Sequence, residues 1–496
     1  MDYSKLQNGS DIRGVALENE EGKEVNLTES ACRDLGRGFA LWLCRKEKRP
    51  YRVALGRDCR ISGENLLRWM AEELAREGMA VTDMGMATTP AMFMTTVTEG
   101  YNYDAAVMVT ASHLPMERNG YKFFTPAGGL ESADIKEIIA LAASEEHTAL
   151  PEGSMETGSF MDVYAAQLRG KLIAAAGKER PFEGLHIVVD AGNGMGGFYA
   201  DKVLEKLGAD TSGSRYLEPD GRFPNHIPNP EDESAMESIR AAVLENRADF
   251  GVIFDTDVDR AGAVLPDGRE LNRNLLIAAI SAVLLAEHPG TTIVTDSITS
   301  SGLAAFLKEK GGVHRRFKRG YRNVINEAIR LNELGQDCQL AMETSGHGAM
   351  KENYFLDDGA YLVTKLLGEL VRRGDLESLL TGLGEPAESR EFRMNITLED
   401  FKPYGQRVLD ELADYAAHRE GWMPEQENYE GVRVNLDKAH GDGWFLLRLS
   451  LHDPLLPLNI ESDTPGGVKR IAAELAPFLA RYKELDSRKL TEFVNE

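Results

Sequence analysis

Short apolar runs that end in Gly or Asp alternate with longer stretches of helical periodicity along the first 360 residues. Apolar runs of this length bounded by turn residues predict buried strands, and regular alternation of strands with helices is typical of α/β folds with mainly parallel sheets. From about Arg390 the pattern changes. Alternating segments such as WFLLRLSL (444–451), followed by a last helical stretch, predict a smaller α+β unit at the C-terminal end.

The strand pattern occurs three times. In each repeat one strand opens the unit and a second strand runs directly into a polar loop. The opening strands lie at 51–58, 185–194 and 291–297, and the second strands with their loops at 105–115, 248–260 and 338–348. Ligands of open α/β sheets bind beyond the carboxyl ends of the strands, so three equivalent loops would line one site if the units pack around a centre.

Stretches rich in Pro, Gly or Ser divide the chain into four units. They lie near 150–159, 288–290 and 384–386. A length of 496 residues exceeds a single core of ~100 to 200 residues, which agrees with several domains. We expect three similar α/β units with mainly parallel, mixed sheets and a C-terminal α+β domain, at 1–158, 159–288, 289–388 and 389–496.

Charge and cysteine content exclude several classes of protein. The formal net charge of −24 would repel a nucleic acid backbone, so no nucleic acid partner is expected. Four irregularly spaced cysteines without a CxxC pair predict neither a disulfide framework nor a zinc site, and a reducing cytoplasm fits best. The most apolar run, 275–286, is shorter than the ~20 residues of a bilayer helix, so no membrane partner is expected. Nothing in the sequence predicts an oligomeric state.

The first polar loop contains Ser112 between Ala111 and His113. A lone serine after a strand is most often a turn or cap residue. At a strand exit, however, its hydroxyl can reach a substrate, and Lys122 lies close enough in sequence to give or take a proton. Ser112 is therefore a candidate nucleophile.

The second polar loop places Asp255, Asp257 and Asp259 at alternate positions after an apolar strand. Three such carboxylates repel one another unless a hard cation lies among them, and oxygen ligands suit Mg²⁺. A solvated acidic turn is the alternative. An EF-hand is excluded because Arg260 and Pro266 stand where the calcium loop needs Gly and Glu.

Two further segments carry groups that bind sugars and phosphates. Glu343 and Ser345 can bind vicinal hydroxyls, and His347 can donate to phosphate or relay a proton, although a single His beside Gly is as often structural. Arg448 and Ser450 alternate along a predicted strand end, where a guanidinium and a hydroxyl can clamp a phosphate. The alternative for this pair is a surface strand with a cross-strand arginine.

The order of these four loops resembles the α-D-phosphohexomutase family over nearly the whole chain. Supporting segments are SDIRG (10–14), GRDCRISG (56–63), Thr89-Pro90, VVDAGNGMGG (188–197), PDGRFPNHIPNP (219–230) and KRGYRNVI (318–325). TASH followed by NGxK, together with DxDxDR, is specific in combination.

The resemblance implies a four-domain, heart-shaped mutase that interconverts hexose 1-phosphate and hexose 6-phosphate. It implies Mg²⁺ as cofactor, a phosphoserine, and a hexose 1,6-bisphosphate as intermediate and activator. The implied catalytic groups are Ser112, Lys122, Arg13 and His347, and the implied metal ligands are Ser112, Asp255, Asp257 and Asp259. The implied substrate-binding residues are Thr110, His113, Arg260, Gly320, Tyr321, Arg322, Glu343, Ser345, Arg448 and Ser450.

The chain departs from the family pattern at two places. Leu114 stands where members usually have Asn, and the distal phosphate loop reads RLSLHDP where RxSGTEP is common. Leu451 and His452 thus replace a flexible Gly and a small hydroxyl, which predicts a weaker or differently built phosphate clamp.

The sequence leaves alternatives open for the preferred substrate and for the kind of activity. The ETSGH segment looks most like that of members acting on both mannose and glucose phosphates, with a phosphoglucosamine mutase as the alternative. A non-catalytic sugar-phosphate sensor is an alternative of another class, since a fold does not fix a function. A third alternative is an aspartyl-phosphate phosphatase with DTDV as its nucleophile motif and Lys351, Asp357 and Asp358 in support, which leaves TASHLP and the third aspartate unexplained.

Overall fold

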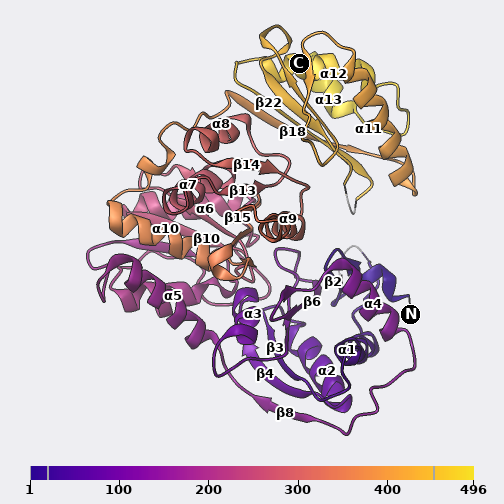
Figure 1. Cartoon of the computed structure of the whole chain (residues 1–496), viewed down its shortest axis with the longest axis vertical. Helices are drawn as coiled ribbons and strands as arrows, with labels where there is room; N and C mark the ends of the chain where they lie inside the picture. Colours follow the sequence, from indigo (N-terminus) through magenta and orange to yellow (C-terminus); the bar gives the residue numbers. More distant parts are fainter. Residues whose placement is uncertain (1, 19–21, 451–452) are drawn as a thin grey trace. The chain divides into compact units, whose positions relative to one another are not determined.

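The structure is a computed structural model that describes residues 2–18, 22–450 and 453–496 (Figure 1). Its contacts divide the chain into two compact units. Unit 1 comprises Met1–Val283 and Ser345–Leu379, and unit 2 comprises Leu284–Thr344 and Leu380–Glu496.

The first sheet of unit 1 lies between two layers of helices. Its strands follow the order β1-β2-β6-β5-β3-β4-β8, and β3 is parallel to both β4 and β5. The strands are β1 (Gln7–Asn8), β2 (Asp11–Val15), β3 (Arg52–Arg57), β4 (Ala80–Met86), β5 (Ala105–Val109), β6 (Arg118–Thr125), β7 (Gly128–Gly129) and β8 (Ser154–Thr157).

Alternate residues of the central strands pack against the two helix layers. Val53 and Val107 share a core with α1 (Glu29–Cys44), α2 (Gly63–Arg76) and α4 (Ser132–Ala142). On the other face α3 (Thr89–Val97) contacts β3, β5 and β6, and a Cβ on Gly56 would meet the Met92 sulfur at 2.4 Å. Figure 1 shows α3 on one side of β3 and β4 and the pair α1 and α2 on the other.

The second sheet of unit 1 has the order β12-β11-β10-β9, with β9 and β10 parallel. Its strands are β9 (Ile187–Asp190), β10 (Phe250–Phe254), β11 (Ala261–Val264) and β12 (Glu270–Leu271). Gly251 lets α6 (Glu233–Asn246) approach closely, because a Cβ there would meet a Val243 methyl at 2.4 Å. Unit 1 also contains α5 (Met161–Ala176), α10 (Gly359–Arg373) and the antiparallel strands β16 (Gly348–Met350) and β17 (Leu356–Asp357).

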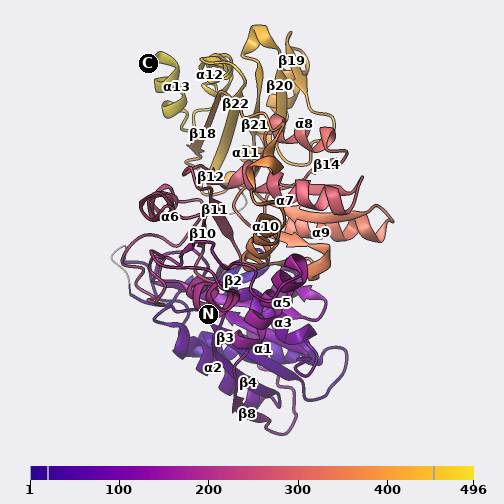
Figure 2. The ribbon, with the colours of Figure 1, turned by 90° about the vertical axis from the view of Figure 1, so that its left-hand side faces the viewer.

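Unit 2 combines a parallel sheet with a C-terminal antiparallel sheet. In the parallel sheet β13 (Thr292–Thr295) pairs with β14 (Val313–Arg316) and β15 (Cys338–Met342), accompanied by α8 (Ser301–Glu309) and α9 (Tyr321–Glu333). Helix α7 (Arg273–Glu287) precedes these strands in sequence. The antiparallel sheet has the order β18-β22-β21-β20-β19, and Figure 2 shows its strands side by side.

The C-terminal sheet buries one face under helices. Its strands are β18 (Glu388–Asn395), β19 (Trp422–Pro424), β20 (Val432–Leu436), β21 (Gly443–Leu447) and β22 (Leu455–Ser462). They share one apolar core with α11 (Phe401–Ala417), α12 (Gly467–Leu479) and α13 (Arg488–Asn495). The helices cover one face of this sheet, and on its other face Trp444 and Leu446 are buried as well.

The threefold strand repeat is confirmed. The strand pairs β3 and β5, β9 and β10, and β13 and β15 are all parallel, and each second strand ends immediately before a predicted polar loop. The fold class is confirmed as well: three α/β domains are followed by a fourth domain built on a sheet. The four domain boundaries stay predictions.

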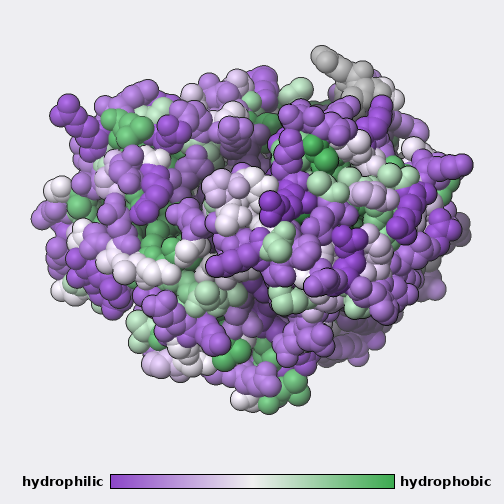
Figure 3. All heavy atoms as spheres, turned by 90° about the horizontal axis from the view of Figure 1, so that it is seen from above, coloured by the Kyte–Doolittle hydropathy of each residue, from purple (hydrophilic) through white to green (hydrophobic). Residues whose placement is uncertain are grey.

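The described residues include no helix long and apolar enough to cross a membrane. The face drawn in Figure 3 is mostly hydrophilic, with hydrophobic side chains only in small separate groups.

Candidate active site

Ser112 lies just beyond β5 in a conformation that few non-glycine residues adopt. Its φ is 51° and the residue is buried. The Ser112 main-chain N–H donates to Thr110 Oγ1 at 2.9 Å, and that hydroxyl donates to Asp58 Oδ2 at 2.7 Å. A left-handed serine costs of order 1 kcal/mol and persists only where its surroundings hold it. The loop is thus built to present this side chain.

The backbone of the serine loop is held by a buried arginine. Arg60 pairs with Asp58 at 3.3 Å and has no exposed side-chain surface. Its guanidinium donates to the main-chain oxygens of Ser112, Leu114, Pro115 and Arg118. Five donors in a rigid fork suit such a set of carbonyl acceptors.

The acid loop after β10 gathers three carboxylates with almost no exposure. One oxygen each from Asp255, Asp257 and Asp259 lies within 4.8 Å of the other two. Burial, and then the charges of Asp259 and Asp257, raise the pKa of Asp255 well above its usual value. Oδ1 atoms of Asp257 and Asp259 are buried and make no hydrogen bond within the described residues. This donor set fits a hard divalent cation.

The serine and the acid loop meet although they come from different sheets. Ser112 Oγ donates to Asp255 Oδ2 at 2.8 Å. Lys122 on β6 pairs with Asp259 and lies 3.3 Å from Asp257 Oδ2. Thr89, the first residue of α3, donates through its hydroxyl to the same Asp257 oxygen at 2.5 Å.

Positive groups surround the serine. Arg13 donates to the Thr110 carbonyl and pairs with Asp11 at 2.8 Å. The Arg260 main-chain N–H donates to Asp255 Oδ1 at 3.2 Å, and its Nε lies 4.0 Å from Oδ2. The charge of Arg260, followed by burial, lowers the pKa of His113 to about 2, so His113 is a neutral imidazole.

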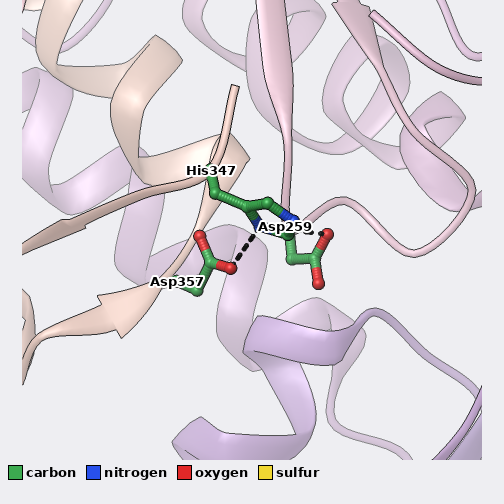
Figure 4. A group of neighbouring side chains, drawn as sticks. All are labelled: Asp259, His347 and Asp357. Carbon is green, nitrogen blue, oxygen red and sulfur yellow. Dashed lines mark ion pairs between the residues drawn. The ribbon is translucent and has the colours of Figure 1, made fainter. Parts of the chain in front are cut away.

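His347 lies between two carboxylates (Figure 4). Its Nδ1 forms an ion pair with Asp357 and lies 3.8 Å from Asp259 Oδ1. Asp357 is in turn positioned by the Gly348 N–H, which donates to its Oδ1 at 2.9 Å. Burial lowers the pKa of His347, but the charges of Asp357 and Asp259 and the hydrogen bond to Asp357 together raise the net pKa above its usual value.

Unit 2 carries the remaining candidates. Glu343 is buried after β15, and its Oε1 accepts from the Gly320 N–H at 2.6 Å. Gly320 has a φ of 115° and precedes α9, whose first turn contains Tyr321 and Arg322. The neighbouring Thr344 hydroxyl donates to buried Asp296 at 2.7 Å.

The distal pair Arg448 and Ser450 follows β21, which ends at Leu447. Main-chain N–H groups of Arg448 and Ser450 donate to Pro457 and Leu455 at 3.1 and 3.0 Å, so the extended pairing continues past the strand. Leu451 and His452 lie outside the described residues.

The predicted residues thus form two groups. Unit 1 brings together Ser112, Thr110, His113, Arg13, Lys122, Asp255, Asp257, Asp259, Arg260 and His347. Unit 2 holds Gly320, Tyr321, Arg322, Glu343, Arg448 and Ser450, while Ser345 is the first residue of the second segment of unit 1.

Three residues beside this cluster were not assigned to it from the sequence. Thr89 and Arg60 lie in segments that carried the family resemblance but no role, and Asp357 was considered only for a phosphatase. A carboxylate ten positions after a histidine gives no sign that the two pair, so only the structure identifies them.

Comparison with known proteins now gives the class. Models of the phosphoglucomutase/phosphomannomutase α/β/α domains I, II and III match residues 4–149, 162–268 and 272–385. A phosphoglucomutase of Neisseria gonorrhoeae is 32% identical over 93% of this chain and 94% of that protein. A phosphomannomutase/phosphoglucomutase of Pseudomonas aeruginosa is 31% identical over 84% of this chain and 85% of its own length.

A solved structure agrees with the sequence relatives. The crystal structure of a phosphoglucomutase/phosphomannomutase family protein from Burkholderia thailandensis matches with a TM-score of 0.81 and 27% identity. The match covers 97% of this chain and 98% of that chain. The chain therefore belongs to the phosphoglucomutase/phosphomannomutase family, the α-D-phosphohexomutases, which are enzymes of intramolecular phosphoryl transfer. The predicted family is confirmed, and the residue roles stay predictions.

Proposed function

We propose that the chain interconverts the 1- and 6-phosphates of glucose and mannose through a phosphate carried on Ser112. The observation that carries this proposal is the contact of Ser112 Oγ with Asp255 at 2.8 Å inside a buried cluster of three carboxylates. The relatives are a phosphoglucomutase and a phosphomannomutase/phosphoglucomutase, and these activities support the same substrates.

Asp255, Asp257 and Asp259, with an oxygen of Ser112 or its phosphate, would hold Mg²⁺. When bound, the cation neutralises charge on the phosphoryl group that is transferred. The Oδ1 atoms of Asp257 and Asp259, which accept no hydrogen bond from the described residues, support this ligand set. Lys122 on β6 and Thr89 on α3 orient the same carboxylates, which fixes the acid loop against the serine.

The reaction consists of two phosphoryl transfers, one from Ser112 to the sugar and one from the sugar back to Ser112. A sugar hydroxyl attacks the phosphorus, the bond from phosphorus to Ser112 Oγ breaks, and the proton of the attacking hydroxyl passes to a nearby base. Lys122, Arg13 and His347 are the groups placed to handle protons here. The resulting hexose 1,6-bisphosphate turns over in the site and returns its other phosphoryl group to Ser112.

The remaining candidate residues would bind the part of the sugar that does not react. Glu343 and Ser345 accept or donate to hydroxyls, Gly320, Tyr321 and Arg322 border the ring, and Arg448 with Ser450 binds the second phosphate. Thr110, His113 and Arg260 would contact the reacting phosphate. We also propose a cytoplasmic location and a small phosphosugar as the partner, which the negative net charge and sparse cysteines support.

The test is turnover of three substrates by the purified chain with Mg²⁺ and a hexose 1,6-bisphosphate. We expect conversion of glucose and mannose 1-phosphates to the 6-phosphates, and weaker conversion of glucosamine 1-phosphate. Ser112→Ala should lose turnover by at least about 10³-fold while a divalent ion still binds. A preference for glucosamine 1-phosphate would indicate a phosphoglucosamine mutase, and no interconversion would indicate a sensor.

Trapping labelled phosphate on the protein separates this mechanism from an aspartyl-phosphate phosphatase. Phosphoserine is stable in acid and supports Ser112 as the carrier. An acyl phosphate that hydroxylamine cleaves would instead assign the covalent step to Asp255, and full activity of Ser112→Ala would refute the serine relay.

A further inference from the structure

The carboxylate of Glu430 is bound by two segments of unit 2 that lie far from it in sequence. The hydroxyl of Ser297, two residues beyond β13, donates to Glu430 Oε2. The main-chain N–H of Arg319 donates to the same oxygen at 3.2 Å. Arg319 directly precedes Gly320, which borders the candidate sugar loop. One carboxylate thus accepts hydrogen bonds from two loops of unit 2, one after β13 and one before α9.

Arg448 lies against the residue that follows Glu430, since a Cβ on Gly431 would lie 2.9 Å from the Cβ of Arg448. Its Nε is buried and has no hydrogen-bond partner within the described residues. Burial lowers the pKa of Arg448, and among the nearby charges Glu430 opposes this shift while Arg319 adds to it. A buried N–H without an acceptor is costly, so this Nε is available as a donor to an additional anion.

The donor set suits a phosphate ester as well as it suits a carboxylate. Hydroxyl, main-chain N–H and guanidinium groups all donate to both anions, and bonds to a charged acceptor are the strong ones. A phosphate monoester offers three acceptor oxygens and more charge than Glu430. Where a phosphate can enter, the same donors favour it over the carboxylate.

The Glu430 side chain can rotate away from Ser297 and Arg319 without a movement of the loop backbone. The Glu430 side chain is partly exposed, whereas its neighbour Tyr429 packs on Phe317 with ring centroids 5.2 Å apart. Earlier in the loop Glu425 pairs with Arg316 and Arg433, both at 2.9 Å. These contacts anchor the backbone before Glu430, and β20 begins at Val432 after it, so only the side chain needs to rotate.

We propose that Glu430 holds the place of the non-reacting phosphate of the sugar substrate. Ser297, the Arg319 main-chain N–H and Arg448 form the site that takes this phosphate when Glu430 turns away. The inference rests on the proposed mutase function and adds two donors to its phosphate clamp. These donors would compensate for the distal phosphate loop, in which Leu451 and His452 stand in place of the Gly and Thr that are common in the family.

The test measures the affinity of the unphosphorylated full chain for glucose 6-phosphate by calorimetry, with Mg²⁺ and without a bisphosphate activator. Glu430→Ala removes the competing carboxylate and should lower Kd by about tenfold, because the binding-competent state no longer has to be selected. Ser297→Ala removes a donor to the phosphate and should raise Kd by about tenfold.

Two further variants control the experiment. Glu427 is in the same loop, is exposed and pairs with Arg315 at 3.3 Å, so Glu427→Ala removes an equal charge and should leave Kd unchanged. Glu430→Gln keeps the shape of the side chain, loses its charge, and should shift Kd in the same direction as Glu430→Ala. Glu430→Gln keeps the inference testable if Glu430→Ala folds poorly.

An unchanged or higher Kd in both Glu430 variants would overturn the inference. Glu430 would then have only a structural role, in which its carboxylate links the segments of Ser297 and Arg319. Turnover of hexose phosphates by the wild-type chain separates this failure from a wider one. If the wild-type chain turns over sugar phosphates, only the role of Glu430 falls. If it neither binds nor converts them, the proposed function falls too.

Discussion

At the scale of single residues, the acid loop depends on partners from α3 and from β6 of the first sheet of unit 1. Asp257 receives the Thr89 hydroxyl at 2.5 Å and the Lys122 ammonium at 3.3 Å. The Thr89 main-chain N–H also donates to the Asp257 carbonyl at 2.9 Å. Side chain and backbone of one threonine therefore fix the orientation of a predicted metal ligand.

Replacing Thr89 by valine should weaken divalent-ion binding. The variant keeps the shape of the side chain and loses a hydrogen bond to a charged acceptor, worth about 1.5 to 3 kcal/mol, so Kd for Mg²⁺ should rise by roughly tenfold or more. Calorimetric titration of the full chain measures this. Thr96 on the same helix donates only to the Phe93 carbonyl, so Thr96→Val is the matched control. Equal affinities in the two variants would contradict the role of Thr89.

What the sequence predicts at this scale is limited to contiguous motifs. Ser112 and the three aspartates stand out because each motif places its groups within a few positions on one loop. Thr89 and Asp257 are 168 positions apart, so nothing local predicts that they touch. The same holds for Arg60, whose carbonyl partners become visible only when the chain is folded.

At the scale of elements, strand β2 carries Arg13 to the serine loop through its pairing with β6. Arg13 lies opposite Gly120 in the antiparallel register. A Cβ on Gly120 would lie 1.9 Å from the Ile12 carbonyl oxygen and 3.0 Å from the Arg13 side chain. Glycine is therefore required here by a close approach of two backbones.

Gly120→Ala should destabilise unit 1 by about 3 kcal/mol, near the upper end of overpacking costs, because a backbone atom cannot give way as a side chain can. It should also lower turnover, since Arg13 moves with its strand. Thermal unfolding and activity measure the two effects.

Gly170 is the control. It is an exposed residue in the middle of α5, and nothing lies within 4 Å of the position that an added methyl group would take. Gly170→Ala should therefore stabilise the chain by ~0.5 to 1 kcal/mol. A Gly120→Ala variant as stable as the wild type would refute the close approach.

The strands that the apolar pattern predicts differ from β2 in composition, not in burial. β5, β10 and β15 are buried at every position, and their sequences are apolar except for Gln339 in β15. β2 is also fully buried but reads DIRGV, with two charged side chains that serve the candidate site. Its polar composition follows from function, so an apolar pattern could not reveal it.

At the scale of the whole molecule, the chain forms two units whose segments alternate along the sequence. Pro and Gly stretches predict where domains end, but they carry no information on which domains associate. Residues 284–344 join the C-terminal part, and residues 345–379 return to unit 1. Because the units have separate cores, unfolding of this chain need not be two-state, and stability is best measured for each unit.

Buried carboxylic acids make the stability of unit 2 depend on pH. Burial raises the pKa of Glu461 from 4.5 to about 7, although the Trp444 indole donates to its carboxylate at 2.8 Å. Burial, with the charge of Glu343, raises the pKa of Asp296 from 3.8 to about 7. A raised pKa means that the folded state binds more protons than the unfolded state between the two values. Stability is therefore present below the unfolded pKa and is lost as pH rises toward 7.

Glu461→Gln should remove the share of this dependence that belongs to Glu461. Between pH 5 and pH 7 the stability of the wild type relative to the variant should fall by up to roughly 1.4 kcal/mol per pH unit. The comparison isolates Glu461 from His314, whose pKa burial lowers, so that His314 reduces stability as pH falls below 6.5. Hydrogen exchange of β21 and β22 at the two pH values reports opening of unit 2 alone. A difference between wild type and variant that stays constant with pH would show that Glu461 is ionised in the folded chain throughout this range.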